Sequence, residues 1–323
     1  MDAINQPLLD VRDLSVAFGD TLAVDQISFS IRRGECVALV GESGSGKSVS
    51  ALSILKLLPY PGASHPSGQI RFRGRELLSA AESEMREIRG NDISMIFQEP
   101  MTSLNPVMTV GNQISETVRL HHGASHSEAR DRAIEMLNLV KIAEPRKRIG
   151  NFPHQFSGGQ RQRVMIAMAL ACTPKLLIAD EPTTALDVTI QAQILELIGD
   201  LRQRLGMAVL LITHDLGIVA ERADDVAVMY AGKIVESAKP EAIFNRPKHP
   251  YTIGLLNSIP RLDTQARYLT PIEGTVCNMM TPPGGCKFHP RCAHAMPRCR
   301  EQAPTLKEVA PGHFAACHLH DGS

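Results

Sequence analysis

The sequence predicts an α/β protein in which helices cover a mostly parallel sheet. Three short runs of aliphatic and β-branched residues, at 36–40, 176–179 and 208–212, alternate with longer segments of helical periodicity. Near-continuous apolar runs of this length are typical of strands that helices bury on both faces. A chain of 323 residues can bury such a core without disulfides.

Three other regions depart from this pattern. Residues 8–18 and 23–31 alternate apolar and polar side chains, which predicts an antiparallel β subdomain near the start. Residues 100–156 become polar and carry apolar positions at helical spacing, which predicts an inserted α-helical subdomain. After about residue 240 the composition shifts to Pro, Gly, His and Cys, so we expect a small Cys-rich C-terminal domain.

A glycine-rich segment, GESGSGKS, follows the first apolar strand and opens a predicted helix, which is the context of a phosphate-binding loop. Its glycines let backbone N–H groups and the helix N-terminus face a phosphate, while Lys47 adds positive charge and Ser48 a Mg²⁺ ligand. The alternative is a turn of purely structural use. The expected nucleotide-binding residues of the loop are Gly41, Glu42, Ser43, Gly44, Ser45, Gly46, Lys47 and Ser48.

Two acidic residues, Asp180 and Glu181, end the apolar strand that begins at Leu176. A buried strand of this kind delivers a carboxylate to a metal ion, so we expect Asp180 to bind Mg²⁺ together with Ser48. Glu181 is then placed to orient or deprotonate the attacking water, a contribution of roughly 10² to 10⁴ in rate. The two motifs predict a phosphate-loop NTPase core of the RecA-like type that binds and hydrolyses ATP.

The tetrapeptide Ser157, Gly158, Gly159 and Gln160 precedes a predicted helix at residues 161–171. Alone, the S-x-x-Q pattern is a capping box that only starts a helix. Its position between the phosphate loop and the acidic strand instead resembles the signature of ABC ATPases. In that family the signature of one subunit closes over the γ-phosphate held by another, so the resemblance implies a dimer with composite ATP sites.

Four single residues match the same family in order. Gln98, after a strand at residues 93–97, resembles the Q-loop glutamine, which implies roles in Mg²⁺ binding and catalysis. His214 resembles the catalytic switch histidine, and Phe18 resembles the aromatic residue that stacks on adenine. Asp187 closes a segment similar to the D-loop, which begins at residue 185 and crosses the dimer interface. Taken singly, each would be an ordinary surface or core residue, so the assignment depends on their order.

Five of the seven cysteines lie between residues 277 and 317. Cys286, Cys292, Cys299 and Cys317 are separated by five, six and seventeen residues. In a cytoplasmic protein this pattern favours metal or cluster ligation over disulfides. The C-x-x-C pair typical of structural zinc sites is missing, although nearby histidines leave zinc as an alternative. Four thiolates suit an iron-sulfur cluster. Free thiols are the third alternative, and Cys277 departs from the four-ligand pattern.

The cysteine-rich tail, with residues 248–252 and 255–260 before it, resembles the C-terminal extension of oligopeptide and dipeptide importer ATPases. Members of that group carry a four-iron cluster on such cysteines, so the resemblance implies a [4Fe-4S] cluster. It also implies a peripheral protein on the cytoplasmic face of the bacterial inner membrane. Its expected partners are two transmembrane permease subunits, a second ATPase subunit that is identical or related, and an extracytoplasmic solute-binding protein.

Composition and charge agree with this interpretation. Basic and acidic residues balance at 34 each and Trp is absent, so we expect no nucleic-acid partner. Residues 1–13 lack the features of a signal peptide, and no apolar run approaches the ~18 residues that span a bilayer.

Two alternatives are a soluble ABC ATPase without transport and an export ATPase. The first would more often carry two cassettes, sustained heptads or a basic extension, and the importer-like tail counts against the second. The transported solute stays open, because ATPase subunits do not contain the selective pocket.

We therefore expect four consecutive parts. Residues 1–99 would hold the β subdomain and the phosphate-loop part of the ATPase core, and residues 100–156 the helical signature subdomain. Residues 157–240 would complete the core, and residues 241–323 would form the importer-type C-terminal extension with its cysteines.

Overall fold

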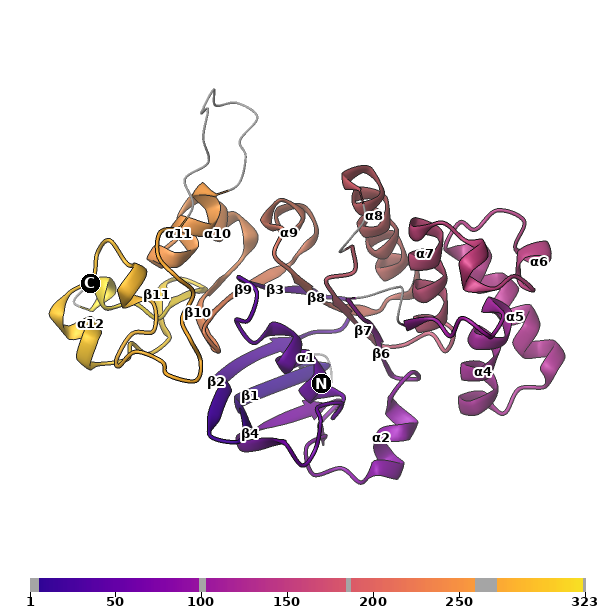
Figure 1. Cartoon of the computed structure of the whole chain (residues 1–323), viewed down its shortest axis with the longest axis horizontal. Helices are drawn as coiled ribbons and strands as arrows, with labels where there is room; N and C mark the ends of the chain where they lie inside the picture. Colours follow the sequence, from indigo (N-terminus) through magenta and orange to yellow (C-terminus); the bar gives the residue numbers. More distant parts are fainter. Residues whose placement is uncertain (1–5, 99–102, 184–186, 259–271, 322–323) are drawn as a thin grey trace. The chain divides into compact units, whose positions relative to one another are not determined.

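A computed structural model describes residues 6–98, 103–183, 187–258 and 272–321 (Figure 1). The chain folds as two compact units. The first draws on Met1–Ile31, Cys36–Leu78 and Ile212–Ser323, and the second on Arg32–Glu35 and Ser79–Leu211. This division groups the C-terminal region with the start of the chain, so a separate Cys-rich domain is not confirmed. The four expected ranges stay a prediction.

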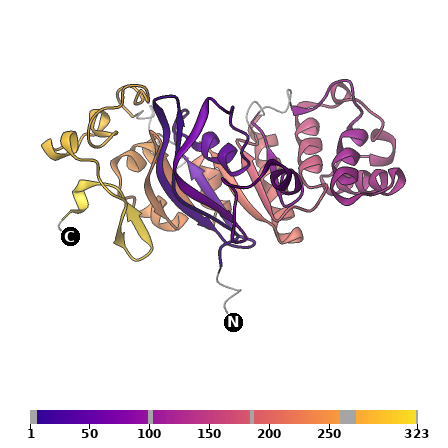
Figure 2. The ribbon, with the colours of Figure 1, turned by 90° about the horizontal axis from the view of Figure 1, so that it is seen from below.

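The first unit contains an antiparallel sheet in the order β2-β1-β4-β5. In β1 (Leu9–Phe18), Leu9, Val11, Leu14 and Val16 are buried, because shifts in strand register turn successive apolar side chains to the same core. In Figure 2 the indigo strands of this sheet, β1 among them, run as long curved ribbons. The other three strands are β2 (Thr21–Ile31), β4 (Ala63–Phe72) and β5 (Arg75–Glu76).

A second set of strands in the first unit runs in the order β3-β9-β10-β12-β11. β3 (Cys36–Val40) is buried along its whole length and pairs in parallel with β9 (Asp225–Tyr230), as the continuous apolar run predicts. The remaining strands are β10 (Lys233–Ala238), β11 (Lys307–Ala310) and β12 (His313–Ala315). The helices are α1 (Lys47–Ile54), α9 (Leu216–Arg222), α10 (Pro240–Asn245), α11 (Pro250–Asn257) and α12 (Pro297–Glu301).

The C-terminal region joins this sheet through backbone pairing. β12 pairs antiparallel with β10, where Glu236 lies opposite Ala315 and Ser237 opposite Phe314. β11 then pairs with β12. The region after residue 240 thus contributes two strands to the sheet that carries β3, which the irregular composition did not predict.

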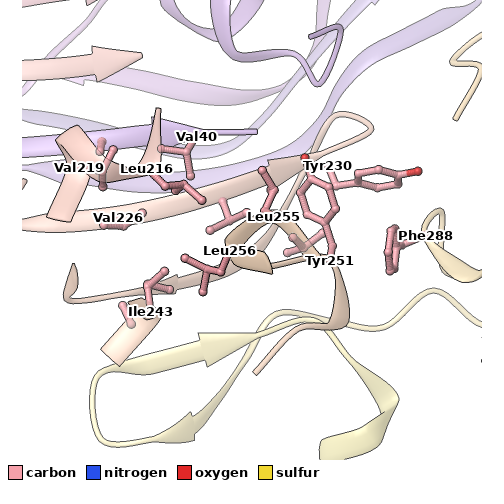
Figure 3. Packing of buried hydrophobic residues seen from close by; sticks show 14 of the residues in the cluster. Val40, Leu216, Val219, Val226, Tyr230, Ile243, Tyr251, Leu255, Leu256 and Phe288 are labelled. Atoms are coloured by element: carbon pink, nitrogen blue, oxygen red, sulfur yellow. The ribbon is translucent and has the colours of Figure 1, made fainter. Parts of the chain in front are cut away.

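One hydrophobic cluster connects the strands, α9, α10 and α11 with the C-terminal region (Figure 3). Tyr230 at the end of β9 packs against Tyr251 of α11 and against Phe288, with ring centroids 4.6 and 5.1 Å apart. Aromatic pairs at such distances contribute about 0.5–1.5 kcal/mol beyond the area that they bury. The cluster gives the C-terminal region a core that it shares with β3 and β9.

The second unit contains β6 (Ile93–Ile96) and β7 (Leu176–Asp180), which pair in parallel. β8 (Ala208–Thr213) is buried throughout, and the chain passes from one unit to the other within it. The parallel pairs of both units confirm the predicted α/β class. The helices are α2 (Glu82–Ile88), α4 (Val110–His122), α5 (His126–Leu139), α6 (Pro145–Arg148), α7 (Gly158–Ala169) and α8 (Val188–Leu205).

Helices α4 to α7 lie together in the second unit (Figure 1). Local signals set their ends. Ser125 and Glu128 form a capping box at the start of α5, and Gly123 ends α4 in the left-handed conformation. No helix among the described residues is both long enough and apolar enough to cross a membrane.

A buried histidine starts helix α11. His249 is fully buried, and its Nδ1 accepts a hydrogen bond of 3.0 Å from the backbone N–H of Tyr251. Burial, with a smaller effect of nearby His320, lowers the pKa of His249 from 6.5 to about 3. Protonation would remove the acceptor and place a charge in the core, so the folded state favours neutral His249.

We expect this histidine to make the protein sensitive to mild acid. Between pH 6.5 and 3 the unfolded chain binds a proton that the folded chain does not, so the free energy of unfolding falls as the pH falls. From His249 alone the loss is about 2 kcal/mol at pH 5. His249→Asn keeps a capping acceptor but cannot take up the proton. Urea unfolding at pH 7 and pH 5 should show a smaller loss of stability for this variant, and equal losses would contradict the assignment.

Candidate active site

The phosphate loop connects the end of β3 with the start of α1. Gly46 caps α1 with φ +102°, and a Cβ atom at this position would lie 2.8 Å from the carbonyl oxygen of Ala23. The buried Lys47 Nζ donates hydrogen bonds to the carbonyl oxygens of Gly41 (2.8 Å) and Glu42 (2.9 Å). The loop therefore gathers an ammonium group and a helix N-terminus at one place, which suits a polyphosphate.

Other predicted residues of the first unit lie around this loop or at strand ends. Ser45 is buried and its Oγ lies 3.4 Å from Lys47 Nζ, whereas Ser43 and Gly44 are exposed. Ser48, in the first turn of α1, is partly buried. Phe18 is the partly exposed last residue of β1.

His214 directly follows β8 and is exposed in the same unit. The neighbouring Asp215 starts α9 by accepting a hydrogen bond from the N–H of Gly217 at 2.9 Å. The strand end and the helix cap thus fix the backbone on both sides of His214.

In the second unit, Asp180 and Glu181 lie at the carboxyl end of β7. Asp180 is buried, and Glu181 adopts a left-handed backbone with φ +44°. The Gln98 amide donates a hydrogen bond of 2.9 Å to the carboxylate of Glu181. The structure thus brings together two side chains that lie 83 residues apart. A left-handed backbone at a non-glycine residue is sterically costly, and its surroundings must hold it in place.

The tetrapeptide of the signature starts α7. Ser157 Oγ accepts from the N–H of Gln160 at 3.4 Å, and Gln160 Oε1 accepts from the N–H of Ser157 at 3.2 Å. The capping box that the sequence allowed is therefore present. A Cβ atom on Gly159 would lie 2.9 Å from Ile190 Cγ2, which gives this glycine a packing role as well, while Gly158 is partly exposed.

The aspartate of the predicted D-loop has a structural role in this chain. Asp187 Oδ1 accepts a hydrogen bond of 2.9 Å from the N–H of Ile190 and so caps α8. The rest of that segment, residues 185 and 186, lies outside the described residues. The nucleotide-contacting role of Asp187 stays a prediction.

Four cysteines of the C-terminal region line one small cavity together with His249, Phe288 and His318. They are Cys286, Cys292, Cys299 and Cys317. All four are free thiols, and Cys277 does not line this cavity. Within the described part of the chain, no group of three or more His, Cys, Asp or Glu side chains has a metal-binding arrangement. The predicted cluster is therefore not confirmed.

The cavity environment favours the protonated thiols. Burial raises the pKa of Cys286 and Cys292, and it raises the pKa of Cys317 to about 11. The neighbouring cysteines contribute to the raised pKa of Cys317, because thiolates at short distance repel one another. A cation bound at the cavity would reverse this preference, since a coordinated thiol is deprotonated.

Two residues to which the sequence assigned no role contact the phosphate loop. They are Tyr251 of α11 and Arg291, which lies between Cys286 and Cys292, and both bind Glu42. Residue spacing gave no signal for these contacts, because more than two hundred residues separate the partners.

Comparisons with known proteins agree with the motifs. Residues 24–184 match the family model described as ABC transporter, and residues 235–299 match the model described as oligopeptide/dipeptide transporter, C-terminal region. A dimeric, ADP- and Pi-bound structure of the ATP-binding cassette MJ0796 has a TM-score of 0.63 and 27% identity. It covers 72% of this chain and 98% of that cassette.

Full-length relatives extend the similarity over nearly the whole chain. A probable peptide ABC transporter ATP-binding protein of Sinorhizobium fredii is 57% identical over 96% of this chain and 94% of its own length. An oligopeptide transport ATP-binding protein of Salmonella typhimurium and a dipeptide transport ATP-binding protein of Escherichia coli are each 51% identical over 96% of this chain, and 93% and 96% of their own lengths are covered. With its phosphate loop, acidic strand and signature in place, the chain belongs to the ATP-binding proteins of ABC transporters, in the group with the oligopeptide/dipeptide transporter C-terminal region.

Proposed function

We propose that this chain is the ATP-hydrolysing subunit of an importer for peptides or related small solutes. The main support is that one chain contains two features. Lys47 of the phosphate loop is hydrogen-bonded to the backbone of that loop, and Gln98 is hydrogen-bonded to Glu181 at the end of β7. The 51–57% identity to peptide, oligopeptide and dipeptide transport ATP-binding proteins supports the substrate class.

The two motifs divide the hydrolysis reaction between them. In this proposal the α1 N-terminus and Lys47 bind the β- and γ-phosphates. Ser48 and Asp180 would hold Mg²⁺, because hydroxyl and carboxylate oxygens are ligands that this ion prefers. The bound ion would neutralise charge on the phosphates.

Glu181 would orient the attacking water and accept its proton. Gln98, which already donates to this carboxylate, would hold it in place and reach the metal. His214 would contact the γ-phosphate from the strand end after β8.

A complete site would need a second ATPase subunit. The signature residues Ser157, Gly158, Gly159 and Gln160 would then close over the γ-phosphate of the partner, with the α7 N-terminus directed at its charge. The dimeric form of the similar cassette MJ0796 supports this assembly. Phe18 would stack on adenine, and Asp187 would lie near the interface.

Closure of this dimer by ATP and its reopening after hydrolysis would drive two membrane permeases between their inward- and outward-facing states. An extracytoplasmic solute-binding protein would deliver the substrate. The chain would act on the cytoplasmic face of the inner membrane, held there by the permeases.

We further propose that Cys286, Cys292, Cys299 and Cys317 hold a [4Fe-4S] cluster. The donor set supports this proposal, since four unbridged thiols from one chain segment line one cavity. The cluster would link these four positions of the chain covalently, in addition to the hydrophobic core that the region shares with β3 and β9. Zinc and free thiols are the competing states.

Replacing Glu181 by Gln should separate ATP binding from hydrolysis. The amide keeps the hydrogen-bonding shape but cannot accept a proton, so we expect turnover to fall about 10² to 10⁴-fold while nucleotide affinity stays near the wild-type value. Steady-state phosphate release and equilibrium nucleotide titration measure the two effects. Near-normal turnover by Glu181→Gln would exclude the assigned role.

The same variant can identify the partners. Tagged Glu181→Gln, isolated with ATP in mild detergent, should retain two polytopic permeases and a second ATPase subunit. The retained proteins can be named by mass spectrometry. Ribosomal or DNA-bound proteins without permeases would support a soluble ABC ATPase instead.

Anaerobic purification should yield a coloured protein with about four irons and four acid-labile sulfides per chain. Cys299→Ser should lose the metal and the colour because it removes one of the four cavity thiols. Cys277→Ser is the matched control and should keep both. A colourless protein with stoichiometric zinc would contradict the cluster.

A further inference from the structure

Two residues of the C-terminal region form hydrogen bonds with Glu42, the second residue of the phosphate loop. Arg291 donates two hydrogen bonds to the carboxylate of Glu42, from Nη1 at 2.7 Å and from Nη2 at 3.1 Å. The backbone N–H of Glu42 donates to the hydroxyl of Tyr251 at 2.8 Å. Both the side chain and the backbone of Glu42 are therefore fixed by residues more than two hundred positions away.

Arg291 is itself held firmly. Its side chain is 4% exposed, against 27% for Glu42, and it also donates to the carbonyl oxygens of Glu273 (3.1 Å) and Ile272 (3.2 Å). Its guanidinium lies about 6 Å from the ring centroid of Phe288. The guanidinium is a permanent cation, and its two hydrogen bonds hold that charge against Glu42. The planar, bidentate pairing requires arginine, since lysine offers a single point charge.

Tyr251 is equally constrained. It is fully buried in the aromatic cluster, where its ring packs against both Tyr230 and Phe288 (Figure 3). Burial raises the pKa of its hydroxyl, which stays uncharged. The hydroxyl oxygen therefore remains a neutral acceptor for the Glu42 N–H.

Glu42 lies inside the phosphate-binding machinery. Its carbonyl oxygen accepts from Lys47 Nζ at 2.9 Å and from the N–H of Ser45 at 3.3 Å. The backbone of the neighbouring Gly41 packs closely against β9, because a Cβ atom there would collide with the carbonyl oxygen of Met229. A shift of Glu42 would thus displace the groups that shape the loop.

The charge of Glu42 adds a second effect. A carboxylate in a loop that binds a polyphosphate repels the ligand unless a cation neutralises it. Arg291 supplies that cation from a largely buried position, where screening by solvent is weak.

We propose that Arg291 and Tyr251 are positioning residues for nucleotide binding, so that the C-terminal region sets the affinity of the phosphate loop for ATP. The inference rests on the proposed ATPase function. Since Arg291 lies between the cavity cysteines Cys286 and Cys292, it further places the cysteine-rich segment in direct mechanical contact with the nucleotide site.

The test compares ATP affinity, KM and kcat of the full-length chain and its variants. Loss of a charge-assisted pair predicts that Arg291→Gln weakens ATP binding and raises KM about tenfold. Because Arg291 does not touch the reacting atoms, kcat should change less than twofold. Arg291→Lys should lie between Gln and wild type, and Tyr251→Phe should weaken binding about threefold. Arg12→Gln, which breaks an exposed arginine–carboxylate pair with Asp10 in the same unit, is the matched control and should match wild type.

A rescue experiment separates the charge effect of Arg291 from positioning and from general stability. Adding Glu42→Gln to Arg291→Gln removes the unneutralised carboxylate, so the double variant should recover the affinity lost to repulsion. An unrescued loss with a lowered free energy of unfolding would assign Arg291 a purely structural role, an unrescued loss at unchanged stability would support positioning, and wild-type affinity of Arg291→Gln would overturn the proposal. If Arg291→Gln fails to fold, the ATP affinities of Arg291→Lys and Tyr251→Phe are the test. Weaker binding would support the proposal, and wild-type affinity would overturn it. Absence of ATP binding by the wild-type chain would instead contradict the ATPase function itself.

Discussion

Glu236 places a carboxylate at zero exposure in β10, and the arrangement of the first unit depends on satisfying it. The backbone N–H groups of Lys248 and His249 donate to its two oxygens at 2.7 and 2.8 Å, and His313 Nε2 donates at 2.6 Å. A buried charge without such partners would cost several kcal/mol. Glu236 therefore requires both the entry to α11 and the start of β12 to lie beside β10. The same placement brings Tyr251 to the phosphate loop.

The parts of the fold that follow local rules could be predicted from sequence. Residues 36–40 and 176–180 are short apolar runs without alternation, and both form fully buried strands. The phosphate loop could be located because its glycines and Lys47 stand between such a strand and a helix. The order of the motifs then led to the correct family, although each single residue was ambiguous.

The rest depends on contacts that no local pattern encodes. Glu42 and Arg291 are 249 positions apart, and Arg291 stands in a segment whose composition suggested only cysteine ligation. β12 is a three-residue strand, too short for its alternation to be visible, and its pairing with β10 and β11 defines it. At the signature the sequence is ambiguous for another reason. Ser157 and Gln160 form a capping box, and the proposed γ-phosphate contact would use the same two residues.

The pairing of Arg291 with Glu42 limits where such chains can be truncated and which segments can be exchanged between relatives. The two matching family models cover separate ranges, residues 24–184 and 235–299, as if a cassette carried an appendage. A chain cut after residue 240 would leave Glu42 without its cation, Glu236 without its donors and β10 as an open sheet edge. Chimeras that swap the extension between relatives would have to exchange the loop residue and its arginine together. The contacts of this protein thus cross the boundary between the two modules, and we expect the smallest stable cassette to include the extension.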